Sequence, residues 1–344
     1  MKRLALALAV AAGCRGAPCK PSSLFLELTF LGAAADATSL EVVLSLDGAP
    51  EQRHPLERAR AGASETLEID LPDYSPGAML QVRVDTLAGG SRTGSATGRF
   101  ALAPSCTVET LSVGALECPQ PTTTQPAFVD PLDGSDDMRH GGGTGVCANK
   151  TLTFALGYAP GPIVLAPGTY QAPDETLPFV LIGAQTLDCG GATLTGSAPY
   201  PPRGVTVTVV LDGTANQIQN CKIVGGSSTV ICVYVDTAGA GAGHIISDCD
   251  ISQCPGTMGK GSNIEMDAPG DHVSVSHTTL RDGWIGIGWY GIDHIGTMSD
   301  NTFSGMRDAD IFCGAAEPSP QLSGSGNVHS VTGAACFSCS GCPF

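Results

Sequence analysis

The chain has 344 residues, of which 15% are charged and 5% aromatic, with 45 Gly, 24 Pro and a formal net charge of −16. So many glycines and prolines with so few charged residues disfavour a protein of long helices and favour short strands joined by turns. The acidic balance, with no basic stripe along the sequence, disfavours nucleic-acid binding. At about 150 residues per domain, the length predicts two domains.

Residues 1–20 predict a signal peptide and a tether. Met1–Arg3 is positively charged and Leu4–Ala12 is an apolar run too short to span a bilayer. The run ends Ala-Ala-Gly-Cys14, which resembles the lipobox of bacterial lipoproteins. That resemblance implies a lipid on Cys14 and, since Arg15 rather than Asp follows, anchoring of an exported protein in the outer membrane at the cell surface. An ordinary signal peptide cleaved nearby is the alternative.

Residues 21–117 predict a small β-sandwich. Apolar and polar residues alternate in short segments, and Asp47-Gly48 after one of them is typical of a hairpin turn. Six or seven such strands between turns are typical of a sandwich. The pattern is similar to that of immunoglobulin-like domains of exported bacterial proteins, which implies a spacer. The segments are 24–28, 40–46, 67–71, 80–85, 96–101 and 107–113.

Residues 118–127, Cys-Pro-Gln-Pro-Thr-Thr-Thr-Gln-Pro-Ala, predict a stiff and extended linker. A second domain, 128–344, follows it. Four acidic residues open this domain, but their spacing does not fit a calcium loop, so we expect an Asx-rich turn without a metal. They are Asp130, Asp133, Asp136 and Asp137.

A six-residue pattern recurs in the second domain: an apolar residue, then Asn, Asp or His two positions later, then an apolar residue three further. A regular repeat of this size predicts coils stacked on one another, because one coil cannot bury its apolar face alone. We expect the polar residues at the bends of the coils, where their side chains satisfy turn amides; they are Asn220, Asp248, His277 and Asp300, with Gly191 one repeat earlier. The last apolar residues then form an inward stack of Ile223, Ile251, Leu280 and Phe303.

Several spaced motifs open the second domain. Phe-Val-Asp-Pro-Leu-Asp-Gly-Ser-Asp-Asp at 128–137 is followed by Gly-Thr-Gly at 143–145, a helical stretch at 151–156 and Ile-Val-Leu-Ala-Pro-Gly-Thr-Tyr at 163–170. This succession resembles DUF1565-like exported domains of the pectin-lyase-like fold, over residues 128 to 330. The resemblance implies a right-handed parallel β-helix but no particular activity. We therefore expect an all-β chain in which a β-sandwich precedes a β-helix with a Cys-rich C-terminal cap.

A polysaccharide-active enzyme, either a lyase or a glycoside hydrolase, is one function that the fold permits. Such enzymes need clustered carboxylates with a base or an acid, and the candidates on adjacent repeats are Asp248, Asp250, His277 and Arg281. However, the motifs of polygalacturonase-like enzymes are missing, and bend positions explain Asp248 and His277 without catalysis. The sequence favours a binding or structural protein of the cell envelope.

The densest aromatic cluster is Trp284, Trp289 and Tyr290. Its rings are candidates for stacking on sugars, which would make a polysaccharide or another envelope component the partner and leave the lipid as the only membrane contact. Alternation along a strand instead places one tryptophan in the core.

Fourteen cysteines are typical of an exported protein with disulfides, and no cofactor is expected. Without Cys14 thirteen remain, so one thiol is free or pairs with another chain. We expect disulfides to staple the last coil, among Cys313, Cys336, Cys339 and Cys342, rather than a metal half-site. Cys221 and Cys249 occupy equivalent positions and are candidates for a pair, with Cys232 and Cys254 as competing partners.

Overall fold

The computed structural model describes residues 8–10, 23–58, 61–71, 74–115, 118–136, 140–236, 243–256, 261–267, 272–314 and 320–344. The chain is all-β, which confirms the predicted class, and it divides into two compact units, 1–117 and 118–344. Cys14 lies outside the described residues, and of the predicted signal only Leu8–Val10 is described, as a strand. No helix within the described ranges has the length and hydropathy to cross a membrane.

The first unit contains one eight-stranded sheet in the order β1-β5-β2-β8-β7-β6-β3-β4. Its neighbouring strands are antiparallel except β2 and β8, and the two halves of the sheet join through only two residue pairs between β7 and β8. Asp47 and Gly48 both have positive φ and turn β3 into β4, as the Asp-Gly signal predicted. The elements are β1 (Leu8–Val10), β2 (Ser23–Phe30), η1 (Gly32–Asp36), β3 (Ser39–Leu46), β4 (Gln52–Glu57), β5 (Ser64–Asp70), β6 (Met79–Ala88), β7 (Ser91–Ala101) and β8 (Thr107–Ala115).

The segment 118–127, predicted to be a linker, is grouped with the second unit. Cys118 forms a disulfide with Cys147, and the Pro119 carbonyl accepts a hydrogen bond from the Gly142 amide. The last residues of the segment already enter strand β9. Proline content made this segment look extended, but covalent and backbone contacts attach it to the domain that follows.

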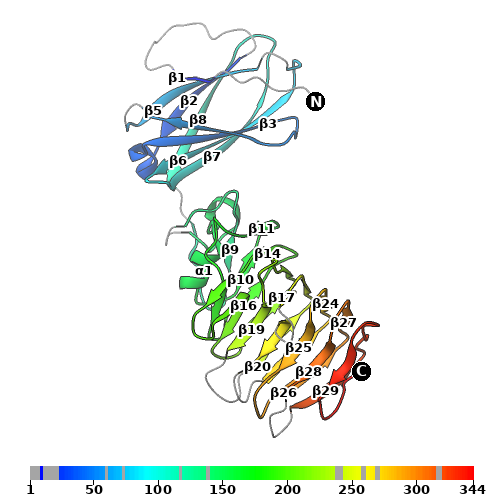
Figure 1. Ribbon diagram of the computed structural model, residues 1–344. Helices are drawn as coiled ribbons and strands as arrows, with labels where there is room; N and C mark the ends of the chain where they lie inside the picture. The colour runs from blue at the N-terminus through cyan, green and yellow to red at the C-terminus, as the bar shows by residue number, and fades with distance from the viewer. Residues whose placement is uncertain are drawn as a thin grey trace. The chain divides into compact units, whose positions relative to one another are not determined.

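The second unit is built on three parallel sheets (Figure 1). The helix α1 (Leu152–Tyr158), predicted from the family resemblance, contacts the first strands, and η2 (Gly145–Cys147) precedes it. The first sheet contains β9 (Ala127–Val129), β10 (Ile163–Leu165), β13 (Thr186–Asp188), β17 (Gln217–Gln219), β20 (Gly243–Ser247), β23 (His272–Ser276), β26 (Ile295–Ser299) and β29 (Gln321–Ser325). The second contains β11 (Thr169–Tyr170), β14 (Thr193–Thr195), β18 (Lys222–Val224), β21 (Asp250–Ser252), β24 (Thr279–Arg281) and β27 (Thr302–Ser304). The third contains β12 (Phe179–Ile182), β16 (Val205–Asp212), β19 (Ile231–Asp236), β22 (Ser262–Met266), β25 (Ile285–Trp289), β28 (Ala309–Cys313) and β30 (Ala334–Phe337), with β15 (Ala198–Tyr200) antiparallel to β16.

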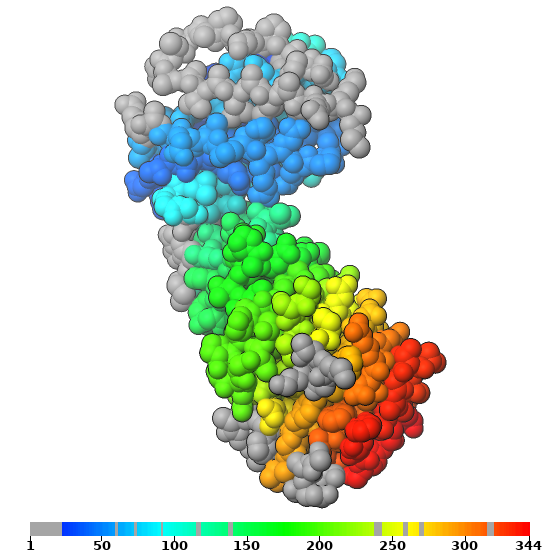
Figure 2. All heavy atoms as spheres, viewed as in Figure 1, coloured from blue at the N-terminus to red at the C-terminus, as the bar shows by residue number. Residues whose placement is uncertain are grey.

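The chain passes through the three sheets in turn, and each passage forms one coil stacked on the previous one. In Figure 2 the colour of this unit changes in order from green to red along it. The repeats found in the sequence are in register: Ile223 pairs with Ile251, which pairs with Leu280, which pairs with Phe303, and all four side chains are buried. The predicted inward stack is therefore confirmed.

The bend between the first and second sheets uses left-handed backbone. Asn220, Asp248, His277 and Asp300 have φ between 49° and 56°, a conformation that Asn and Asp tolerate better than most residues. Their side chains are exposed, however. The expectation that these residues satisfy buried turn amides is wrong, because in left-handed backbone at this bend their side chains point to solvent.

The residue after the bend points inward, and in the last three coils its polar side chain forms a hydrogen-bonded ladder. Asn327 Oδ1 accepts from the Asn301 amide at 3.1 Å, and Asn301 Oδ1 accepts from the Thr278 amide at 3.0 Å. Thr278 Oγ1 in turn accepts from the Cys249 amide at 3.4 Å. The Asn301 side chain also donates to the Val275 carbonyl. Polar side chains thus satisfy the buried amides of successive bends.

The disulfides differ from the predicted pairing at Cys221. Cys221 pairs with Cys189 of the preceding coil and not with Cys249, which is buried and is the free cysteine of the described residues. Burial raises the pKa of the Cys249 thiol to about 12, so it stays protonated. The other pairs that join two described residues are Cys118–Cys147, Cys232–Cys254, Cys313–Cys339 and Cys336–Cys342.

The last seven residues, 338–344, lie against the final coil. Two disulfides, Cys313–Cys339 and Cys336–Cys342, attach this tail, and Pro343 is buried. The Phe344 ring lies 5.6 Å from the Phe303 ring, between centroids. The tail thereby covers the end of the inward stack.

Candidate functional site

The four candidate catalytic residues do not form one site. Arg281 Nε and a terminal nitrogen contact the two carboxylate oxygens of Asp250 at 2.8 and 2.5 Å, in a pair more than a third exposed. His277 Nε2 lies 3.7 Å from Asp300 and is 62% exposed, and Asp248 is exposed at the neighbouring bend. Arg281 and Asp250 neutralise each other on an open surface, which is typical of a surface ion pair rather than of a catalytic cluster.

The tryptophan candidates differ in position from Tyr290. Trp289 is fully buried in the core, so its candidacy as a ligand-binding residue is wrong, because its place on β25 turns the ring inward. Its ring packs at 5.7 Å against His294. Trp284 is half-buried immediately before β25. Tyr290, just after β25, lies against the outer surface of the third sheet.

Tyr290 begins a row of aromatic rings on the outer face of the third sheet, where Figure 1 shows β25 and β28 side by side. The Tyr290 ring lies 5.4 Å from the Phe312 ring, and Phe312 stacks on Phe337 at 5.5 Å with an interplanar angle of 6°. Phe337 is 50% exposed, and the other two rings are half-buried. We call Tyr290, Phe312 and Phe337 the aromatic row.

Gly288 makes room for the aromatic row. This residue is the register partner of Phe312 and, on its other side, of Glu265. A Cβ at position 288 would lie 2.7 Å from a ring carbon of Tyr290 and 2.8 Å from Ser262 Oγ. Only glycine therefore lets the Tyr290 ring lie across the sheet at this point.

Glu265 borders the aromatic row and has an unusual proton affinity. Burial raises the pKa of this carboxyl group, a hydrogen bond from Ser262 Oγ at 3.0 Å lowers it and the nearby Asp267 raises it, and together they bring the pKa to about 7. Ser262 also interacts with the Tyr290 hydroxyl. Glu265 thus holds and releases a proton near neutral pH, which ordinary glutamates do not.

A second group of polar residues lies beside Glu265. Tyr234, the register partner of Glu265, donates to Asp267 at 3.4 Å. Arg203 Nε lies 3.0 Å from Asp236, and the Tyr200 hydroxyl donates to the same carboxylate at 3.1 Å. The Tyr200 and Tyr234 rings are 6.1 Å apart, so aromatic side chains continue on this side of Glu265.

Sequence analysis missed these residues although a signal was present. Three strands of the third sheet end in an aspartate or are followed by one: Asp212, Asp236 and Asp267. Asp212 pairs in register with Asp236, and burial together with the Asp236 charge raises the pKa of Asp212. The six-residue pattern marks only the bend before the second sheet, so it does not point to this series of aspartates on the third sheet.

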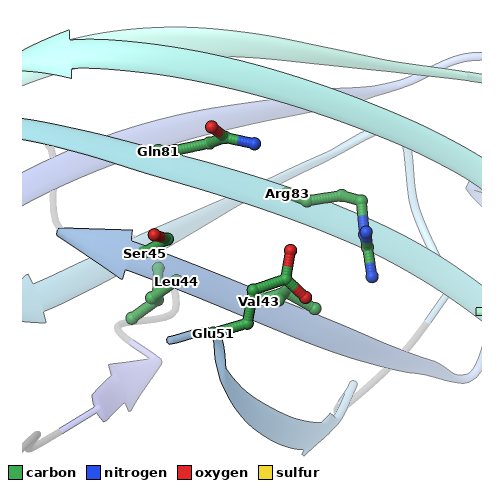
Figure 3. A pocket seen from close by; sticks show the side chains of 6 residues that line it. All are labelled: Val43, Leu44, Ser45, Glu51, Gln81 and Arg83. Carbon is green, nitrogen blue, oxygen red and sulfur yellow. The ribbon is translucent and has the colours of Figure 1, made fainter. Parts of the chain in front are cut away.

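Other candidate sites are weaker. The hollow in Figure 3, on the first unit, is lined by Val43, Leu44, Ser45, Glu51, Gln81 and Arg83. Its cavity volume of ≈ 10 Å³ is about what a single water needs, far below the roughly 300–1,000 Å³ of small-molecule pockets. Within the part of the chain that the structure describes, no group of three or more His, Cys, Asp or Glu side chains is placed to hold a metal.

No protein-family model, curated protein or solved structure matches this chain.

Proposed function

We propose that this protein is an exported, lipid-anchored protein of the cell surface that binds a glycan along the outer face of the third sheet. The observation that carries the proposal is the aromatic row beside Glu265 and Asp267. Aromatic faces pack on the apolar faces of sugar rings, while carboxylates accept hydrogen bonds from sugar hydroxyls. A row that crosses three successive strands suits an extended chain better than a single small molecule.

The second unit is, in this proposal, a right-handed parallel β-helix, and the first is a β-sandwich that acts as a spacer. The in-order passage through three parallel sheets supports the helix, and the two sheet halves around one core support the sandwich. Export is supported by the disulfides and by the signal-like N-terminus.

The binding proposal is tested by a glycan-array screen of the oxidised protein. We expect binding to at least one extended glycan, weakened tenfold or more, about 1.4 kcal/mol, by Phe337→Ala. Leu132→Ala, an equally simple truncation of a side chain that is 72% exposed on the same unit, is the control and should bind normally. Silence across the array, or equal loss in both variants, would contradict the proposal.

A second candidate function is glycoside cleavage, which the proton affinity of Glu265 favours. A carboxyl group that is protonated near pH 7 is suited to donate a proton to a glycosidic oxygen. Product analysis on every bound glycan tests this function. Cleavage that Glu265→Gln abolishes while binding persists would establish an enzyme, whereas binding without products would leave recognition as the function.

Anchoring is tested separately by mass spectrometry of the mature N-terminus in a bacterial host. A diacylglycerol-modified Cys14 is expected, and Cys14→Ser should release the protein from membranes. An unmodified N-terminus cleaved elsewhere would remove the anchor from the proposal without affecting the glycan site.

A further inference from the structure

The aromatic row lies in a field dominated by negative charge. Four carboxyl groups raise the pKa of the Tyr234 or Tyr290 hydroxyl through their negative charge, and one guanidinium lowers the pKa of Tyr234. The carboxyl groups belong to Asp236, Glu265, Asp267 and Asp308, and the guanidinium belongs to Arg203.

The single cation of this group is already paired. Arg203 Nε and a terminal nitrogen lie 3.0 and 2.5 Å from one oxygen of Asp236. Among the described residues, neither Glu265 nor Asp267 forms an ion pair. Asp267 is exposed and Glu265 half-buried, so both can face a bound molecule.

We infer that the ligand on the aromatic row is a glycan that carries protonated amino groups, an amino-sugar polymer, an inference that rests on the proposed function. The rings define where the sugar packs, and the carboxyl groups define the charge that the sugar must carry. An ammonium group beside Asp267 gains an opposite charge without displacing an existing partner, and its approach also favours the ionised form of Glu265, whose pKa is about 7.

The same arrangement selects against acidic polymers. A chain of uronates would place its carboxylates against those of Glu265 and Asp267, and like charges at close range lower affinity by repulsion. Arg203 cannot compensate for this repulsion without leaving Asp236, which the Tyr200 hydroxyl also contacts. A neutral glycan avoids the repulsion and can donate hydroxyl hydrogen bonds to the two carboxyl groups, but it gains no charge pairing from them.

The inference is tested by calorimetric titration of the full-length oxidised protein with three matched hexamers. The probes are glucosamine, N-acetylglucosamine and galacturonate hexamers, at pH 6 and low salt, where the amine is largely protonated. We expect the glucosamine hexamer to bind at least tenfold tighter than the acetylated one, and the galacturonate hexamer not to bind. The preference should shrink in 0.5 M salt, because screening weakens charge pairs.

Two variants separate charge from fold. Asp267→Asn should weaken the binding of the glucosamine hexamer several-fold and leave the binding of the acetylated hexamer unchanged. Asp300→Asn removes another exposed carboxylate, at the bend between the first and second sheets, and should change the binding of neither hexamer.

The outcomes distinguish the inference from the function on which it rests. Equal or tighter binding of the acetylated or galacturonate hexamer would overturn the inference and leave glycan binding intact. Failure of all three hexamers, together with a silent glycan array, would overturn both.

Discussion

At the scale of single residues, the site depends on the absence of one side chain. Gly288 leaves space into which Tyr290 lays its ring, and Tyr290 then continues into Phe312 and Phe337. A strand glycine usually weakens a sheet, so a glycine here marks a place where another group must approach closely.

Gly288→Ala should displace the Tyr290 ring. We expect the loss in the free energy of glycan binding to exceed the loss in the free energy of unfolding. The added Cβ would meet Tyr290 and Ser262 within 3 Å, and such overpacking costs about 1–3 kcal/mol. Binding titrations and thermal unfolding measure the two effects. Gly243→Ala, where a Cβ meets nothing within 4 Å, is the matched control. Unchanged binding by Gly288→Ala would show that the ring position is not needed.

Glu265 should make the protein less stable as the pH rises. Its pKa is raised from 4.5 to about 7 on folding, so the folded state binds more protons between these values and loses the advantage as pH rises through 7. Glu265→Gln, which mimics the protonated form, should therefore gain stability relative to the wild type at pH 8, by about 1–3 kcal/mol. Urea unfolding at pH 5 and pH 8 measures this difference. A difference that does not change with pH would contradict the assigned proton affinity.

At the scale of elements, each coil is tied to the next by the residue after the left-handed bend. Asn301 is fully buried, and its side chain accepts from the Thr278 amide and donates to the Val275 carbonyl. This ladder runs through several bends, so its loss affects the stacking of coils rather than a single turn.

Asn301→Ala should destabilise the second unit by about 2–4 kcal/mol, because two buried backbone groups lose their partners. The neighbouring Asp300→Asn, which keeps the left-handed bend and an exposed side chain, should be nearly neutral. Denaturant unfolding compares the two variants. Similar effects of both would mean that the bend conformation, and not the inward ladder, holds the coils together.

The sequence predicted the coils better than the site. Apolar residues at a regular repeat must be buried, so the stack from Ile223 to Phe303 could be inferred without a structure. Which polar residue of a bend points inward depends on a single left-handed residue, and the repeat alone placed that role on Asp300 instead of its neighbour Asn301. The aromatic row joins Tyr290, Phe312 and Phe337, which are far apart in sequence and share a face only because three strands align.

At the scale of the whole molecule, the second unit begins earlier than composition suggested. The Cys118–Cys147 disulfide fixes its first residues, and the two cysteines are 29 positions apart in the sequence. Cross-links over longer loops restrict the unfolded chain more, so this bridge should stabilise the unit more than the six-residue loop of Cys336–Cys342.

Replacing Cys118 and Cys147 together by serine should lower the stability of the second unit by about 3 kcal/mol and expose 118–127 to proteases. The Cys336→Ser/Cys342→Ser variant serves as the comparison and should lose less. Limited proteolysis with mass spectrometry locates the cuts, and urea unfolding measures the loss. Protection of 118–127 in the first variant would show that its backbone contacts suffice without the disulfide.

A stack of strands with a fixed spacing has no intrinsic length, so something outside the repeat must stop it. Strand β29 ends the first sheet with the sequence Gln-Leu-Ser-Gly-Ser, which has neither the charge nor the proline that normally guards an open edge. In the tail 338–344, Phe344 packs on Phe303 and two disulfides hold the segment against the final coil. These seven residues therefore cover apolar surface at this end of the stack, where a strand of another molecule could otherwise pair.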